Sequence, residues 1–299
     1  MSDHADDIPE SLPDAAKVEA VRSILDQLLE SSRLYSKSKD YKELLDYVVK
    51  LRPFAPFNAM LLQVQNPGLS YAATAHDWQR RFKRTPKEGA RPLLILWPFG
   101  PVALVFDQMD TEGDPLPEDA FAFPVLGDMT ESSLSQFIGR LEKVCIHVQA
   151  CDAGDRKAGY IRLAQPAKSD KEYAHYVLLM NRKHSPAVRF VTLAHELGHL
   201  FLGHLGLDAK LKIPERRGLG YAQQELEAES VAYIVCGRQG IKPKSETYLA
   251  GFMAQETTIG HLDIYQVMRA GGRVETLLGL AGHPSELNVK PMKSTRSGS

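Results

Sequence analysis

The chain has 299 residues, 43% hydrophobic and 24% charged, which is enough for one large or two modest globular domains. Its formal net charge of −1 excludes nucleic-acid binding driven by overall charge, although a local basic patch remains compatible with it. No apolar stretch reaches the roughly 18–20 residues of a membrane span, and the acidic start lacks the layout of a secretion signal. Three cysteines without a CxxC pair indicate unpaired thiols in a reducing compartment, so we expect a cytoplasmic protein.

Charge divides the sequence into a basic and a neutral half. Residues 33–105 hold 12 Lys and Arg against 5 Asp and Glu, whereas residues 106–130 hold seven acidic residues and no Lys or Arg. The stretch 111–128, which is acidic and rich in Pro and Gly, is predicted to be a linker. The expected parts are a helical region at 1–34, a basic domain at 35–127, a second domain at 128–285 and a disordered tail at 286–299.

In the first half, apolar spacing predicts helices at 14–34, 41–49 and 58–64. Thr74 is placed to cap a short helix that carries Trp78 and Phe82. The apolar runs 92–97 and 101–106 are separated by Pro-Phe-Gly-Pro, which predicts a β-hairpin.

The second half mixes strands and helices. The pattern predicts strands at 159–163 and 173–179, helices at 131–144, 188–204 and 223–236, and shorter helices between 246 and 280. Such a mixture favours the α+β class. We expect an N-terminal α+β domain with a β-hairpin, followed by a mainly helical domain with a small sheet.

The strongest functional signal is VTLAHELGHLFLGH at 191–204, which contains His-Glu-x-x-His as His195, Glu196 and His199. Histidines four residues apart leave the same face of a helix, and two neutral imidazoles suit one tetrahedral zinc ion. Glu196 lies next to them, where it can act as general base on a water that the metal activates. The other interpretation is two surface histidines, but the apolar flanks predict a buried helix in which unpaired polar groups would be costly.

A catalytic zinc site needs a third protein ligand. His204 lies too far round the helix, so we expect it either beside a ligand or at the surface. On the next helix, Glu225 and Glu229 share a face, and Ala228 keeps a neighbouring face thin enough for close packing. We predict Glu225 as the third ligand, Glu229 as an acceptor that orients a ligating histidine, and Glu227 as the fallback ligand. The alternative is a solvated acidic helix face.

At these residues the chain resembles the ImmA/IrrE family of metallo-endopeptidases, over roughly 131–246. The similar pieces are GYIRL, YVLLMN, RFVTLAHELGHLFLGH and ELEAESVAYIV. The family carries Glu-x-x-Ala-Asn, whose Glu completes a gluzincin-like zinc site. Glu225 and Ala228 match it, whereas Glu229 stands where Asn or Asp is commoner. The resemblance implies a zincin-like metallopeptidase domain at 128–285 and a protein substrate, because some members cut DNA-bound transcriptional repressors.

The first half is similar to the single-stranded-DNA-binding domain of ArdC-type antirestriction proteins, in PFNAMLL, KEGARPLLILWPF, VFDQMDT and Trp78. ArdC proteins also pair this domain with a metallopeptidase-like domain. Cations near aromatic residues are the ingredients of single-strand binding, although a solvated basic surface beside core aromatics has the same pattern. The candidate nucleic-acid contacts are Trp78, Arg80, Arg81, Lys83, Arg84, Lys87 and Arg91.

Other residues carry weaker signals. Tyr221 is expected either to donate a hydrogen bond to a developing oxyanion or to be a buried structural residue. Asn58 is expected to cap a helix or to make a polar contact, and Cys236 to be a small core residue. The histidines expected to be ordinary are His175, His184, His261 and His283.

Three functions are compatible with these features. The first is a cytoplasmic zinc endopeptidase that hydrolyses a peptide bond of a protein substrate, such as a DNA-bound repressor, with Glu196 as base. The second is a single-stranded-DNA-binding antirestriction or protective protein whose metal site is structural or regulatory, although a structural site has no use for Glu196. The third is a scaffold whose helical C-terminus binds a partner. The sequence leaves open whether zinc or manganese is used in cells.

Overall fold

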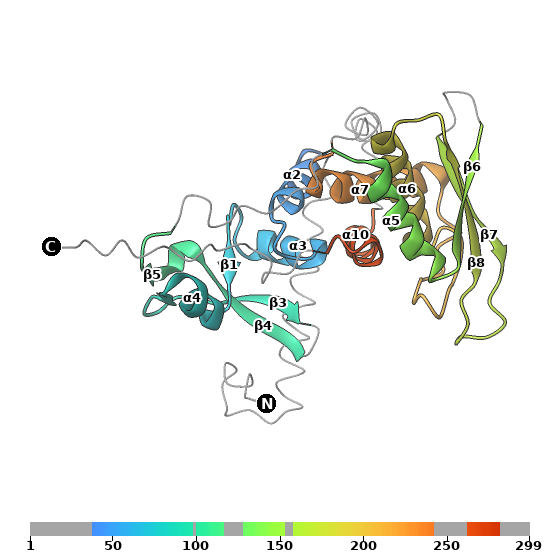
Figure 1. Cartoon of the computed structure of the whole chain (residues 1–299). Helices are drawn as coiled ribbons and strands as arrows, with labels where there is room; N and C mark the ends of the chain where they lie inside the picture. The colour runs from blue at the N-terminus through green and yellow to red at the C-terminus, as the bar shows by residue number, and fades with distance from the viewer. Residues whose placement is uncertain (1–37, 98–99, 117–127, 153–157, 242–261, 282–299) are drawn as a thin grey trace.

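The computed structural model describes residues 38–97, 100–116, 128–152, 158–241 and 262–281. These residues form helices and small sheets, so the predicted α+β class is confirmed. Figure 1 shows a layer of helices between the small sheets of the first half at one end of the molecule and the sheet of the second half at the other. The predicted helix at 14–34, the tail at 286–299, His261 and His283 lie outside the described residues.

The described part of the first half contains the helices predicted at 41–49 and 58–64, the short helix after Thr74 and the hairpin. Its elements are α2 (Ser38–Lys50), α3 (Pro56–Gln65), β1 (Ala72–Ala73), α4 (Ala75–Phe82), β2 (Arg84–Pro86), β3 (Leu93–Trp97), β4 (Gly100–Asp107), η2 (Gln108–Asp110) and β5 (Thr111–Gly113). As predicted, the Thr74 side chain caps α4 by accepting a hydrogen bond from the Asp77 backbone N–H. Strands β3 and β4 pair antiparallel, and β1 joins them in the order β1-β4-β3.

The predicted linker is wrong over its first residues, because Thr111–Gly113 forms strand β5 and pairs antiparallel with β2. The Arg84 side chain holds this strand by donating to the backbone oxygens of Thr111, at 2.5 Å, and Asp114, at 2.7 Å. A guanidinium with several donors can satisfy carbonyls that a short strand leaves unpaired. The acidic composition of the predicted linker therefore did not prevent its first residues from pairing with β2.

Helix α3 covers the outer edge of β3. The Asn58 amide exchanges two hydrogen bonds of 3.0 Å with the backbone of Leu96, and Gln65 exchanges two of 2.8 Å with that of Leu94. The expectation that Asn58 caps a helix is wrong, because it lies inside α3 and makes the polar contact instead. These two amides take the place of a neighbouring strand and protect the edge.

The described part of the second half forms a three-stranded sheet and four helices. Its elements are α5 (Glu131–Glu142), β6 (Ile146–Cys151), β7 (Gly159–Gln165), β8 (His175–Asn181), α6 (Pro186–Leu202), α7 (Tyr221–Arg238) and α10 (Ile264–Leu278). The strand order is β6-β8-β7, with β6 parallel and β7 antiparallel to the central β8. Strand β6 is not predicted from the sequence, although Ile146 and Val148 alternate with polar residues.

The two halves share one hydrophobic core. Helices α2 and α3 pack against α7 and α10, and their buried residues belong to one cluster with those of α6. Arg238, at the end of α7, donates to the backbone oxygens of Val48, Leu51, Arg52 and Phe54 and pairs with buried Glu275 of α10 at 2.6 Å. The domain boundary between 127 and 128 remains a prediction, but α2 and α3 pack with the helices of the second half.

No described helix is long and apolar enough to cross a membrane. The three cysteines are unpaired, and Cys236 is fully buried, as expected of a core residue. Burial raises the pKa of the Cys236 thiol, which keeps it protonated.

Replacing Arg238 by Met should lower the free energy of unfolding by about 3–5 kcal/mol, because Glu275 would stay buried without its partner. Urea unfolding measured by circular dichroism gives this difference. Arg182→Met is the matched control, since it removes only the exposed ion pair with Asp152 and should leave stability nearly unchanged. Equal losses in the two variants would contradict a stabilising role of Arg238.

Candidate metal centre

Helix α6 presents the two histidines of the motif on one face. Ser185 caps its start and Pro186 occupies its first turn, while Gly203 ends it in the left-handed conformation. His195 and His199, one turn apart, point their Nε2 atoms at each other at 3.1 Å. Their side chains are only 16% and 14% exposed, so the two surface histidines of the alternative interpretation are excluded.

Helix α7 brings a carboxylate to the same point. The Glu225 Oε2 atom lies 3.5 Å from His195 Nε2, and its Oε1 atom lies 3.5 Å from His199 Nε2. The approach depends on Gly198, since a Cβ there would lie 3.2 Å from the Ala228 backbone oxygen and 3.2 Å from the Val231 Cβ. The thin face predicted at Ala228 therefore packs directly on the histidine motif.

The donor atoms suit a single divalent ion. Two ligand atoms at about 2.05 Å from a tetrahedral ion lie about 3.3 Å apart. The two Nε2 atoms lie 3.1 Å apart, each lies 3.5 Å from one of the two Glu225 oxygens, and one ligand atom from each residue can be chosen so that all three lie within 4.8 Å of one another. Two imidazole nitrogens and one carboxylate oxygen form the donor set of many catalytic zinc sites. Within the described part of the chain, no other His, Cys, Asp and Glu side chains gather closely enough to hold a metal.

Electrostatics favour the ligand forms of two of these residues. Burial, aided by the neighbouring His195, lowers the pKa of His199 to about 3, so this imidazole is neutral. Burial opposes ionisation of Glu225, but the hydrogen bond to His195 and the electrostatic effect of the neighbouring histidines outweigh burial and lower the pKa of the carboxyl. For His195, burial is likewise outweighed by Glu225 and Glu229, which raise the pKa of its imidazole.

Glu196 lies beside the ligands and contacts the sheet. Its Oε2 atom accepts a hydrogen bond of 2.9 Å from the Ile161 backbone N–H on β7. Burial raises the pKa of Glu196, against the opposing effects of His195 and of that hydrogen bond. The contact with Ile161 was not foreseen, because nothing in the sequence relates residue 161 to residue 196.

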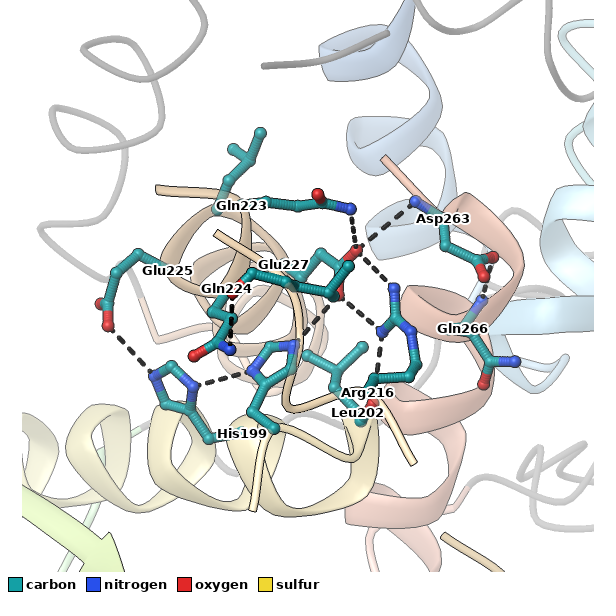
Figure 2. Close-up of polar contacts among 12 residues, drawn as sticks. His199, Leu202, Arg216, Gln223, Gln224, Glu225, Glu227, Asp263 and Gln266 are labelled. Atoms are coloured by element: carbon teal, nitrogen blue, oxygen red, sulfur yellow. Dashed lines mark hydrogen bonds and ion pairs between the residues drawn. The ribbon is translucent and has the colours of Figure 1, made fainter. Parts of the chain in front are cut away.

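Glu229 and His204 lie beside the ligating histidines, whereas Glu227 does not. Glu229 Oε1 lies 3.5 Å from His195 Nδ1, but without hydrogen-bond geometry, so its predicted orienting role remains a prediction. Glu227, the fallback ligand, turns away and forms two hydrogen bonds of 2.7 Å with Arg216 (Figure 2). His204 is buried against His199, with 2.9 Å between their Nδ1 atoms, so it lies beside a ligand rather than at the surface.

Tyr221 opens α7 and is 77% exposed, so it is not the buried structural residue of one prediction. Its hydroxyl is hydrogen-bonded to Glu225, whose charge raises the pKa of the phenol. The side chain thus lies at the rim of the site.

Several of the predicted nucleic-acid contacts are instead bonded to other parts of the protein. The expectation for Trp78 is wrong, because its ring is fully buried against Tyr71 and Phe82 and its Nε1–H donates to the Phe106 backbone oxygen. A buried ring has no face to offer a base. Arg84 holds β5, and Lys87 donates to the Met109 backbone oxygen at 2.8 Å.

The other candidate cations differ in exposure. Arg81 donates to the Tyr71 hydroxyl at 3.2 Å. Arg80, Lys83 and Arg91 are exposed, and Arg80 pairs with Asp77 on the same helix. Fewer of the seven candidate nucleic-acid contacts are therefore free at the surface than the sequence suggests.

Of the histidines expected to be ordinary, two are described. His175 stacks on His147 with 3.4 Å between Nδ1 and Nε2, respectively, and neither belongs to a metal-binding group. The His184 backbone N–H donates to the Asn181 backbone oxygen at 3.3 Å, and His184 does not belong to the metal-binding group. Neither contributes to the candidate centre.

Comparisons with known proteins support the resemblance seen in the sequence. Residues 141–236, about a third of the chain, match the peptidase family M78 model described as the IrrE N-terminal-like domain. This segment contains β6 to β8, α6 and most of α7, and with them the two histidines and Glu225.

The chain is also similar to solved structures of the antirestriction protein ArdC from plasmid R388. The Mn(II)-bound structure is 17% identical, with a TM-score of 0.39, over 80% of this chain and 97% of that chain. The metal-free structure is 18% identical, with a TM-score of 0.36, over 75% and 82% of the two chains. No curated protein matches the chain.

Enlarging Gly198 should weaken metal binding in steps, because a side chain there pushes α7 and Glu225 away from the histidines. We expect a few-fold lower zinc affinity for Gly198→Ala and about tenfold or more for Gly198→Val, measured by competition with a chromophoric chelator. Gly139→Val on α5 is the matched control, since a Cβ there meets no atom within 4 Å. A folded Gly198→Val variant with unchanged affinity would show that the close approach is unnecessary.

Proposed function

We propose that this protein is a zinc-dependent endopeptidase that hydrolyses a peptide bond of a protein substrate. One observation carries the proposal, namely that His195, His199 and Glu225 converge on one point, with the Glu196 carboxylate near enough to interact with His195 and Glu225. The match of 141–236 to a peptidase family supports it, because that segment includes all four residues.

Each residue has a distinct role in this proposal. The Nε2 atoms of His195 and His199 and the carboxylate of Glu225 would hold the ion, and their nitrogen and oxygen donors suit zinc. Bound zinc supplies Lewis acidity, which eases deprotonation of water and attack on a carbonyl carbon. Glu196, held by the Ile161 N–H, would accept the proton of the attacking water and deliver it to the leaving nitrogen.

The position of Glu196 also favours an extended peptide as substrate. Strand β7 is at the edge of the β6-β8-β7 sheet, and the Ile161 N–H points off that edge to the Glu196 carboxylate. An extended chain can add to such an edge by main-chain hydrogen bonds, which would carry its peptide bond past Glu196. A DNA-bound repressor in the cytoplasm is the substrate that the family resemblance implies.

Replacing Glu196 by Gln should abolish proton transfer while the ligands stay in place. We expect zinc affinity within about threefold of the unaltered chain and hydrolysis slower by about 10²–10⁴-fold. Labelled casein and an internally quenched peptide library are the substrates, and mass spectrometry identifies the cleaved bond. Glu172→Gln, at an exposed position, is the control and should cleave normally.

Other outcomes would separate the competing functions. Hydrolysis that survives in Glu196→Gln would remove Glu196 as the base. A chain that binds zinc tightly but cleaves neither casein nor any library peptide would favour a structural or regulatory site, as in the protective-protein alternative. Loss of zinc binding in Glu225→Gln would distinguish a ligand from a surface acid.

Binding of single-stranded DNA by the first half is a separate proposal, supported by the exposed Arg80, Lys83 and Arg91. With a fluorescein-labelled oligothymidine of 20 nucleotides, the affinity of the full chain should fall with salt. Changing Lys83 and Arg91 to Ala should lower the log–log salt slope by about 0.7 for each lost phosphate contact. Lys143 and Lys171, exposed in the second half, provide the control pair. If the chain does not bind the oligonucleotide, or if the salt slope is the same after Lys83 and Arg91 are changed to Ala, binding of single-stranded DNA is rejected.

A further inference from the structure

A second buried histidine lies behind His199, on the side of the ring away from Glu225. His199 Nε2 faces His195 Nε2 and Glu225, whereas its Nδ1 atom lies 2.9 Å from His204 Nδ1. The His204 side chain is only 2% exposed, so water does not compete for this contact. One ring nitrogen of His199 therefore faces the candidate metal position, and the other faces His204.

The direction of this hydrogen bond follows from the donors and acceptors. Two ring nitrogens 2.9 Å apart need one proton between them. If His199 Nε2 offers its lone pair to a metal, the proton is on Nδ1, and His204 Nδ1 accepts it. Because His204 Nδ1 accepts, the ring proton of His204 is on Nε2, which donates to Glu227 Oε2 at 3.1 Å. The two imidazoles and the carboxylate thus form a chain with one consistent direction.

The far end of this chain is firmly held. Glu227 is fully buried, and its carboxylate accepts two hydrogen bonds of 2.7 Å from Arg216 and one of 3.2 Å from Gln223 (Figure 2). Arg216 also donates to the Leu202 backbone oxygen at 3.2 Å. The Glu227 carboxylate is therefore the common acceptor of His204, Arg216 and Gln223.

The turn after α6 sets His204 in this position. Gly203 has φ of +83°, and a Cβ there would lie 2.1 Å from the Pro214 backbone oxygen. The Arg216 backbone N–H donates to the Gly203 oxygen at 3.1 Å, so the segment that carries Arg216 is tied to the same turn. The helix end, His204 and Arg216 are therefore built as one unit.

We propose that His204 is a positioning residue for the metal centre. By accepting the Nδ1–H of His199, it holds the tautomer and ring orientation that direct His199 Nε2 at the ion, and Glu227 with Arg216 holds His204. The inference rests on the proposed function in that it requires a metal bound by His199. His204 would thus orient His199, whereas Glu229 lies near His195, the other ligating histidine.

Two replacements of His204 separate positioning from simple packing. Asn keeps an acceptor oxygen near the position of the lost Nδ1, whereas Phe keeps the ring volume without any acceptor. Both lose the hydrogen bond to Glu227, so they share that destabilising effect. Tyr176→Phe is the matched control, because it removes the buried hydrogen bond of 2.8 Å to Asp208 and no contact of the candidate ligands.

The experiment measures zinc affinity of the full chain by chelator competition, together with the visible absorption of the cobalt-loaded form. We expect His204→Phe to bind zinc 10–100-fold more weakly and to change the cobalt spectrum, as is typical when the partner of a ligand is lost. His204→Asn should recover most of the affinity, and Tyr176→Phe should match the unaltered chain in both readouts.

Three results would overturn the inference. Unchanged affinity in a folded His204→Phe variant would reduce His204 to a packing residue. Equal weakening in the Asn and Phe variants would show that the acceptor for His199 is not what matters. Failure of the unaltered chain to bind zinc would overturn the proposed function itself, and this inference with it, so the two failures are distinguishable.

Discussion

Close contact between α6 and α7 at Gly198 and Ala228 is the constraint on which the candidate centre depends. The two histidines are neighbours on one helix and meet at 3.1 Å by local geometry alone, but Glu225 belongs to another helix. It reaches them because no side chain stands between the backbones at Gly198. A metal site assembled from two elements needs such a fixed distance, since ligand atoms must agree within a few tenths of an ångström.

Helix α7 also organises the buried charges of the second half. Its start carries Glu225 and Glu227, and its end carries Arg238, about 20 Å further along at 1.5 Å per residue. Glu227 pairs with Arg216 behind the candidate centre, while Arg238 pairs with Glu275 and binds the loop after α2. Both pairs are buried and hydrogen-bonded, so the arginine partner offsets the cost of removing each carboxylate from water. One helix therefore connects the site to the helices of the first half.

The errors of sequence interpretation have a common physical cause. Trp78 and the cations around it were read as an exposed set, yet Trp78 fills a small core and Arg84 and Lys87 serve backbone carbonyls. Asn58 pairs with the edge of β3 rather than capping a helix. The sequence interpretation assigned these side chains to nucleic acid or to a helix end, whereas the folded chain supplied a distant backbone group in each case. Spacing cannot reveal such partners, because they are set by which elements lie side by side.

The sequence by itself determined the parts of this protein that depend on local geometry. The helical period places His195 and His199 on one face, Thr74 begins a helix, and the shared face of Glu225 and Glu229 indicates an acidic element for the same site. Only the tertiary structure decided that Glu225 reaches both histidines, that Ile161 holds Glu196, and that His204 joins His199 to Glu227 and Arg216. These contacts link residues 5 to 35 positions apart on different elements or across a sharp turn, and their distances follow from packing rather than from sequence spacing.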